Sequence, residues 1–239
     1  MNDRDHNQHV IDYYDGRIKK TMTPTGNLYT RHHLDELQRV TGIRAGDRVL
    51  DVGCGMGRYS IPLAARGVVV DGLDLSPFLL DRLKEYNDSG REIRTFCVDL
   101  VDHAPEAPAA YDAVVGFFML HHVHDLARCF TAVKRLVKPG GIVAFVEPNA
   151  YSPLYYVQMM ITPSMTWKGD RGIVKMRPGV IFPAMRAAGL ASLALHRFGF
   201  FPPFVAGRPG GMWLEKRLEQ VPVWRPLLPA ALFSARRPD

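Results

Sequence analysis

Short apolar runs alternate along the chain with segments whose apolar residues recur at helical spacing. Leu34, Leu37 and Val40 form one such helical stripe before the first run. Runs that are separated by helical crossovers predict an α/β fold with a parallel, doubly wound sheet. The predicted strands cover residues 48–52, 67–76, 93–100, 111–120, 142–147, 192–198 and 230–236.

The first predicted strand ends in a glycine-rich turn, in which Gly53, Gly55 and Gly57 alternate with other residues. Alternating glycines let the backbone take positive φ values and let a ligand approach closely. A strand, a glycine turn and a helix together begin a nucleotide-binding βαβ unit. A dinucleotide fingerprint would place its third glycine at position 58, where this chain has Arg58. An NAD-dependent oxidoreductase is therefore only an alternative interpretation.

An acidic residue ends the second predicted strand, about twenty residues beyond the glycine turn, where a carboxylate meets ribose hydroxyls. Asp74 and Asp71 both lie near this distance. Ser76-Pro77 follows Asp74 at once and is typical of a helix N-cap with proline at the first helical position. Asp74 is therefore the predicted ribose ligand, because a carboxylate can accept hydrogen bonds from two hydroxyls.

These motifs resemble those of class I S-adenosylmethionine (SAM)-dependent methyltransferases that act on small molecules. The resemblance rests on D-x-G-x-G-x-G at 51–57, on Leu120-His121-His122 and on K-P-G-G at 138–141. It implies a Rossmann-like sheet of seven strands, mostly parallel with one antiparallel strand, and SAM as the cofactor. The cofactor-binding residues that it implies are Asp51, Gly53, Cys54, Gly55, Gly57, Asp74, Leu75, Asp99, Leu100 and Phe117.

The resemblance covers residues 47–149 and fades on either side. We expect a single domain over 1–239, with an N-terminal helical cap (1–45) and a SAM-binding core (46–149). The remaining residues, 150–239, are expected to form a lid or acceptor-site insertion and the last strands.

The reacting methyl group should lie at the carboxyl ends of the strands. His121 is the first candidate for a general base there and His122 the second. Both histidines could instead only shape the loop. Together with His124 they match no known ligand spacing, so no metal is expected.

The acceptor is expected to be small and partly hydrophobic. Aromatic residues and methionines are frequent in 151–167 and 198–204, which favours an apolar pocket. Residues 116–119 lack the Asn/Asp-Pro-Pro-Tyr/Phe tetrad that many methyltransferases of exocyclic or amide nitrogens carry. The predicted reaction is transfer to O, N or C of a secondary metabolite, a quinone-like or a lipid-like acceptor; a catalytically silent SAM-binding regulator is the alternative. The predicted acceptor-site residues are Tyr14, Tyr29, Glu147, Tyr151 and Trp167.

Composition adds limits on partners and location. The net charge is +6, but the basic residues are scattered, so no nucleic-acid partner is predicted. The three cysteines form no CxxC pair and are expected to be buried in a reducing compartment. No apolar run approaches the ~20 residues of a spanning helix. A cytoplasmic enzyme is predicted. The sequence is compatible with a homodimer and does not decide the oligomeric state.

Overall fold

The structure is a computed structural model in which two predicted acceptor-site residues, Tyr14 and Trp167, lie outside the described part. That part comprises residues 22–103, 109–161 and 171–239, together with residues 8, 11, 12, 16 and 18.

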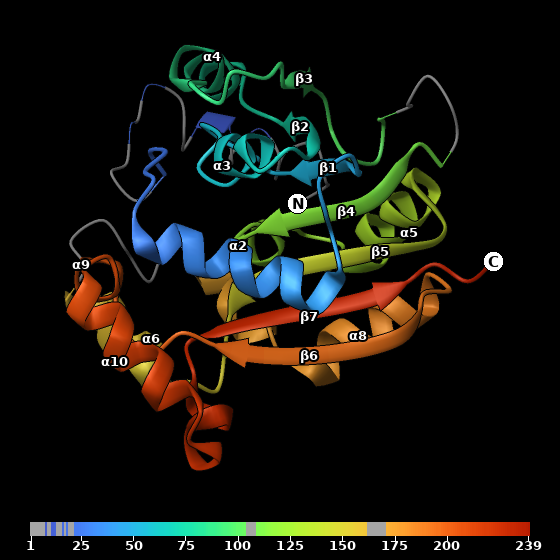
Figure 1. Cartoon of the computed structure of the whole chain (residues 1–239). Helices are drawn as coiled ribbons and strands as arrows, with labels where there is room; N and C mark the ends of the chain where they lie inside the picture. Colours follow the sequence, from blue (N-terminus) through green and yellow to red (C-terminus); the bar gives the residue numbers. More distant parts are fainter. Residues whose placement is uncertain are drawn as a thin grey trace.

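Seven strands form one sheet in the order β3-β2-β1-β4-β5-β7-β6 (Figure 1). Strand β7 is antiparallel to both of its neighbours, and the pairs among β1 to β5 are parallel. This arrangement confirms the predicted doubly wound fold with one antiparallel strand. The strands are β1 (Arg48–Val52), β2 (Val69–Asp74), β3 (Arg94–Cys97), β4 (Tyr111–Phe117), β5 (Val137–Pro148), β6 (Ala191–Phe198) and β7 (Ala230–Arg236).

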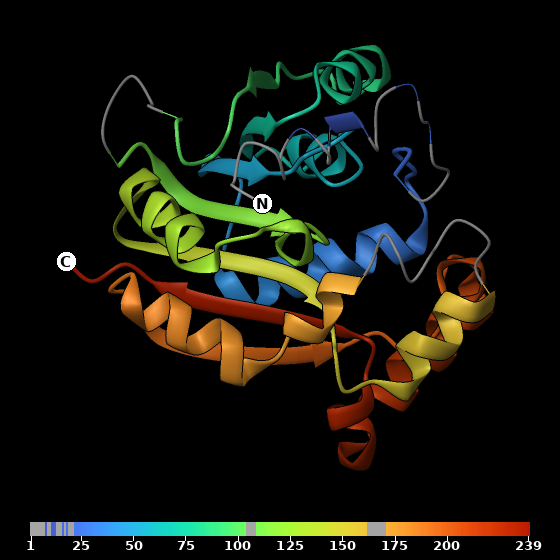
Figure 2. The same ribbon diagram turned by 180° about the vertical axis from the view of Figure 1, so that it is seen from behind.

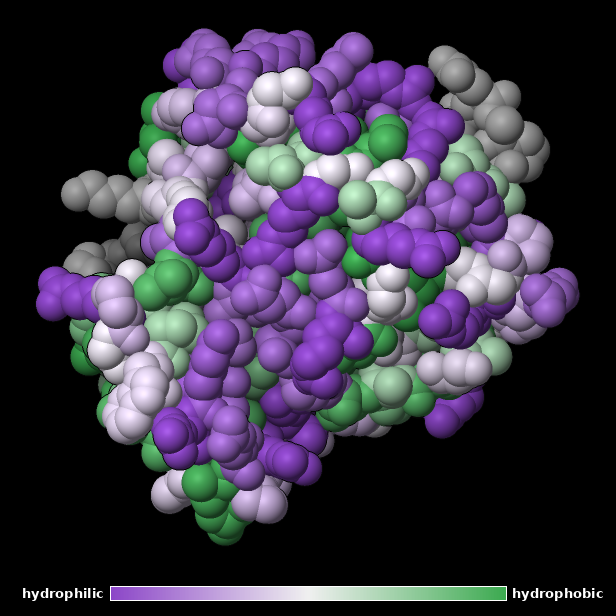
Figure 3. All heavy atoms as spheres, in the orientation of Figure 1, coloured by the Kyte–Doolittle hydropathy of each residue, from purple (hydrophilic) through white to green (hydrophobic). Residues whose placement is uncertain are grey.

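Helices cover both faces of the sheet. One face carries α2 (Leu28–Thr41), α3 (Ser60–Ala65) and α4 (Pro77–Tyr86), and the other carries α5 (Leu126–Leu136) and α8 (Pro178–Ala187) (Figures 1 and 2). The outward surface over most of α2 is hydrophilic (Figure 3). Helix α2 therefore buries one apolar stripe and exposes a polar one.

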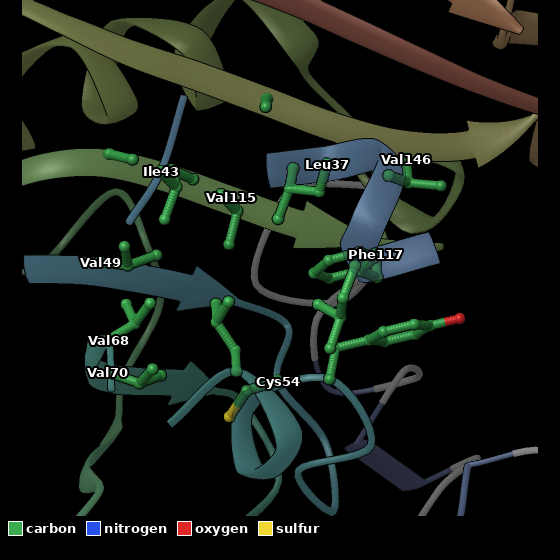
Figure 4. Packing of buried hydrophobic residues seen from close by; sticks show 14 of the residues in the cluster. Leu37, Ile43, Val49, Cys54, Val68, Val70, Val115, Phe117 and Val146 are labelled. Atoms are coloured by element: carbon green, nitrogen blue, oxygen red, sulfur yellow. The ribbon is translucent and has the colours of Figure 1, made fainter. Parts of the chain in front are cut away.

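Alternating residues of the central strands divide the core into two clusters. Val49, Val115 and Val146 belong to the same buried cluster as Leu37 on the α2 face (Figure 4). Their strand neighbours, such as Leu50, point to the opposite face and pack with the apolar residues of α5 and α8. This alternation follows from the two-residue period of a strand, and it makes both faces of the sheet apolar, as parallel sheets require.

One helix cap forms at Ser76, where the sequence predicts it, and another forms at Asp125. The Ser76 side chain accepts the backbone N–H of Leu79 and begins α4, with Pro77 as its first residue. The Asp125 side chain accepts the N–H groups of Ala127 and Arg128 and begins α5. The Ser76 cap closely follows β2, and the Asp125 cap ends the loop after β4, so both caps fix loops at the carboxyl edge of the sheet.

The C-terminal part adds elements beside α2. Helices α9 (Pro203–Ala206) and α10 (Pro209–Glu219) pack against α2, and α6 (Pro153–Ile161) lies beside α10 in both views (Figures 1 and 2). The short 3-10 turns are η1 (Leu120–His122), η2 (Arg171–Lys175) and η3 (Pro222–Leu227).

Two local expectations differ from the structure. Strand β5 begins at Val137 and includes the K-P-G-G stretch, because Val137 pairs with Tyr111 before the register shifts. Cys97 is exposed, since it ends the edge strand β3, whereas Cys54 and Cys129 are buried as expected. Among the described helices, none has both the length and the apolarity to cross a membrane.

Candidate active site

A cavity of about 260 Å³ opens at the carboxyl ends of β1, β2 and β4. Most of the residues predicted to bind the cofactor line it: Asp51, Gly53, Cys54, Gly55, Asp74, Leu75, Asp99, Leu100 and Phe117. The three strands come from distant parts of the chain, and their parallel pairing brings these residues to one edge.

The three glycines of the turn all take positive φ, as predicted, but they serve different contacts. The φ values are 68° at Gly53, 52° at Gly55 and 82° at Gly57. Gly53 and Gly55 line the cavity, whereas Gly57 does not. A Cβ at Gly57 would lie 2.8 Å from Ile61 and 2.9 Å from Leu83. Gly57 therefore lets helices α3 and α4 pack closely against the turn.

Asp74 joins the ends of β1 and β2. Its Oδ2 accepts the Gly55 N–H at 2.8 Å and its Oδ1 accepts the Ser76 N–H at 2.9 Å. Burial raises the pKa of the carboxyl, although these two hydrogen bonds favour the charged form. Each oxygen keeps acceptor capacity, because an ionised carboxylate offers about four lone-pair sites.

Asp71, the rival acid, has a different environment and does not line the cavity. Its carboxylate accepts hydrogen bonds from Arg48 at 3.1 Å, from Arg94 at 2.8 Å and from the Tyr111 hydroxyl at 3.0 Å. These partners lie on β1, β3 and β4, so together with Asp71 on β2 they tie four strands together within the sheet. Asp71 therefore supports the fold, and Asp74 faces the cavity.

Asp51 has a buried carboxylate oxygen without a partner. The Ser60 hydroxyl donates to Oδ2 at 2.5 Å, while Oδ1 has no hydrogen-bond partner. Burial raises the pKa of Asp51 to about 7, and the nearby Asp74 adds to the increase. A buried acceptor left unpaired is costly, so this side of the cavity suits a cationic donor on a ligand.

Apolar and aromatic side chains form much of the remaining wall. Leu75 and Leu100 line the cavity with Phe117. The Phe117 ring stacks on the Tyr59 ring with a centroid distance of 3.9 Å and an interplanar angle of 9°. Asp99 lies beside them, and its Oδ1 accepts the Val101 N–H at 2.9 Å. This wall suits a flat, apolar ring with a polar edge.

The two candidate bases occupy different positions. His122 lines the cavity, and its ring centroid lies 4.0 Å from that of His121. His121 is buried outside the lining, with Nδ1 at 2.7 Å from Glu147 Oε2. Glu147 is fully buried, and its other oxygen accepts the N–H groups of Met119 and Leu120 at 2.7 Å each. The His121–Glu147 pair therefore holds the loop from behind.

Two further predicted acceptor-site residues are not brought to the cavity lining. Tyr29 is buried on α2, and the Arg58 guanidinium lies 5.4 Å from its ring centroid. Tyr151 is 54% exposed at the surface.

Several lining residues were not predicted from the sequence. Arg58 and Tyr59 directly follow the glycine turn, so their position in the sequence could have identified them. Phe118 has a φ of 54°, which is strained for a bulky residue and costs about 1–3 kcal/mol. No sequence pattern shows this conformation. The other unpredicted lining residues include Met22, Met119 and Arg128.

Comparison with known proteins shows which sequences the chain is similar to. A model described as a methyltransferase domain matches residues 27–200. The chain is 35% identical over 174 residues to a ubiquinone biosynthesis O-methyltransferase of Chromobacterium violaceum, covering 71% of this chain and 75% of that protein. It is 40% identical over 164 residues to the protein of the same name from Thiobacillus denitrificans, covering 66% and 70%.

A solved structure shares the fold at low sequence identity. It is phosphoethanolamine N-methyltransferase 2 of Haemonchus contortus in complex with S-adenosyl-L-methionine, with a TM-score of 0.62 and 19% identity. The match covers 87% of this chain and 53% of that one, so this chain spans about half of that protein.

Proposed function

The chain belongs to the methyltransferase-domain family, and from this premise we propose that it methylates a hydroxyl oxygen of a small, quinone-like aromatic acceptor. The comparisons support the SAM-dependent methyltransferase activity and the SAM cofactor that the sequence analysis predicts. The silent-regulator and oxidoreductase alternatives are set aside. The choice of oxygen, and of a quinone-like ring, is supported by the names of the relatives from Chromobacterium and Thiobacillus.

The cavity lining offers groups suited to the amino, ribose and adenine parts of SAM. When bound, SAM supplies an electrophilic methyl group and a sulfide leaving group. The unpaired Asp51 Oδ1 would accept from the amino group, and Asp74 would accept from the ribose hydroxyls. Leu75 and Leu100 would contact the adenine, with Asp99 near its amino edge.

Arg58 is the candidate for the carboxylate of the methionine part of SAM. It lines the same cavity as Asp51, directly after the glycine turn. An Arg guanidinium can donate two parallel hydrogen bonds to a carboxylate. The amino and carboxylate groups of the ligand would thus each meet a group of opposite charge.

His122 is the proposed general base. A phenolic hydroxyl becomes a good nucleophile when its proton moves to a nearby base, and a cavity-lining imidazole can accept that proton. His121 and Glu147 would keep this loop in place, because their buried hydrogen bond fixes the residue next to His122. The position of His122 in the wall, with this pair behind it, is the observation that carries the proposal.

Matched acceptors test the proposal. The purified chain would be incubated with SAM and an alkyl-substituted catechol, and with the corresponding aromatic amine as a control. We expect methylation of the catechol oxygen, detected by mass spectrometry together with S-adenosylhomocysteine formation. Methylation of the amine alone would contradict O-transfer.

A further inference from the structure

Three metal-ligating side chains meet on the side of the molecule where α2 packs against α10. His32 lies on α2, and Glu215 and Glu219 lie one helical turn apart on α10. One donor atom from each lies within 4.8 Å of the others. None of these residues lines the cavity described above. The cluster is therefore distinct from the methyl-transfer site.

The cluster is buried, and one of its oxygens has no partner. His32 is 4% exposed and Glu215 is fully buried. Glu215 Oε2 accepts the Phe201 N–H at 3.1 Å, while its Oε1 has no hydrogen-bond partner. Two carboxylates this close together are costly to bury in their charged form unless a positive charge compensates them.

His32 and Glu219 of this cluster already contact each other. His32 Nε2 lies 2.9 Å from Glu219 Oε1, which also accepts the Gly199 N–H at 2.5 Å.

We propose that His32, Glu215 and Glu219 form a site for a divalent transition-metal cation, with Zn²⁺ as the best match. One imidazole nitrogen and two carboxylate oxygens form a ligand set that suits Zn²⁺ better than the all-oxygen sets of Mg²⁺ or Ca²⁺. Two carboxylates also neutralise the charge of such a cation.

The site would join the N-terminal and C-terminal parts of the molecule. His32 and Glu219 are 187 positions apart in the chain. Next to His32 on α2, His33 packs near the rings of Tyr59 and Phe118, both of which line the cavity, at centroid distances of 6.0 and 5.8 Å. A bound cation would therefore hold α2 against α10 and support one wall of the cavity.

The test measures Zn²⁺ binding by the full chain after metal is removed with a chelator. Zn²⁺ is titrated at pH 7.5 in competition with a chromophoric chelator, and the melting temperature is followed with and without Zn²⁺. We expect one equivalent to bind tightly to the unaltered chain and to raise its melting temperature. Glu215→Gln should weaken this binding by more than about 100-fold, because even changes around metal ligands cost 10–100-fold.

A matched control uses a second histidine–glutamate pair, in which Glu36 of α2 meets His196 of β6. Glu36 Oε2 lies 2.6 Å from His196 Nε2, but Glu36 does not belong to the three-residue cluster. Glu36→Gln should bind Zn²⁺ as the unaltered chain does. Equal binding by Glu215→Gln and the unaltered chain would overturn the proposal, as would a lack of tight binding by the unaltered chain. If Glu215→Gln does not fold, as judged by circular dichroism, His32→Gln replaces it with the same expected loss.

Discussion

The backbone N–H of Gly55 donates to Asp74 Oδ2 at 2.8 Å, so the carboxylate at the end of β2 holds the glycine turn that follows β1. One side chain thus fixes the shape of the cavity and also faces into it. Asp71, three residues earlier, has arginine and tyrosine partners within the sheet instead. Substitution of these two acids should therefore give different results.

Asp74→Asn is expected to weaken SAM binding by roughly 1–3 kcal/mol, because hydrogen bonds to a charged carboxylate are lost. Isothermal titration calorimetry with SAM would measure this change. Asp71→Asn is the control: it should lower the melting temperature and leave SAM affinity close to normal. Unchanged SAM affinity in Asp74→Asn would show that the ribose ligand is another residue.

The sequence predicts the cavity well where local signals decide the geometry. The Ser76-Pro77 cap signal shows which of the two acids, Asp74 or Asp71, ends the strand beside the turn, and the glycine spacing identifies the turn itself. The histidine positions are harder to predict, because a 3-10 turn follows the positive φ of Phe118 and determines which side chain enters the cavity. Contacts such as that of His32 with Glu219 depend on segments far apart in the chain, and no periodicity predicts them.

His122→Gln is expected to lower kcat by roughly 10²–10⁴-fold, the usual contribution of a general base. SAM affinity should change little, because the proposed cofactor contacts lie on the other residues of the cavity. His121→Gln should mainly lower the melting temperature, since it disturbs the buried hydrogen bond with Glu147. Single-turnover kinetics would measure the change in catalysis, isothermal titration calorimetry the SAM affinity, and thermal denaturation the melting temperature. If His121→Gln lost catalysis and His122→Gln did not, the assignment of the base would be reversed.

Asp51→Asn should stabilise the protein at alkaline pH in the absence of SAM. The folded pKa of about 7 lies above the ordinary value of 3.8, so the folded state binds more protons between these values. The free energy of unfolding of the unaltered chain therefore decreases as pH rises through this range, and Asn removes the decrease. At pH 8 the variant should gain up to about 4 kcal/mol relative to the unaltered chain.

Urea denaturation at pH 5 and pH 8 would measure this gain, with SAM binding followed in parallel. We expect the same variant to bind SAM more weakly, because the partner of its amino group is lost. Asp81→Asn, which changes an exposed acid on α4, is the control for net charge. A gain that is equal at both pH values would argue against burial of the Asp51 charge.

Gly57→Ala and Gly55→Ala should separate packing from binding. At Gly57 the new methyl group meets Ile61 and Leu83 in a backbone with φ of 82°, so stability should fall by about 1–3 kcal/mol. At Gly55 the nearest atom is Met22 Cε at 3.5 Å, but the methyl group would lie at the cavity lining. We therefore expect the larger loss of SAM affinity in Gly55→Ala, as measured by calorimetry beside urea denaturation. If both variants lost the same stability and the same SAM affinity, the assignment of Gly57 to packing and of Gly55 to binding would be contradicted.

His33 should make the protein sensitive to acid. Burial lowers the pKa of His33 to about 3, while its Nδ1 lies 2.9 Å from the carbonyl oxygen of Tyr29 and its Nε2 has no partner. The ordinary histidine pKa is 6.5, so below this pH the unfolded chain binds a proton that the folded chain does not. The free energy of unfolding therefore decreases as pH falls from 6.5 towards 3.

His33→Phe keeps an aromatic ring in the cluster and removes this titration. Between pH 7.5 and pH 5 the variant should lose less stability than the unaltered chain, by about 2 kcal/mol. Urea denaturation at the two pH values would measure the difference. Tyr59→Phe is the matched control, because it alters the same aromatic cluster without removing a histidine, and it should keep the slope of the unaltered chain. If His33→Phe kept that slope as well, His33 would have to be protonated in the folded protein, and its burial among the rings of Tyr29 and Phe198 would then require a nearby anion.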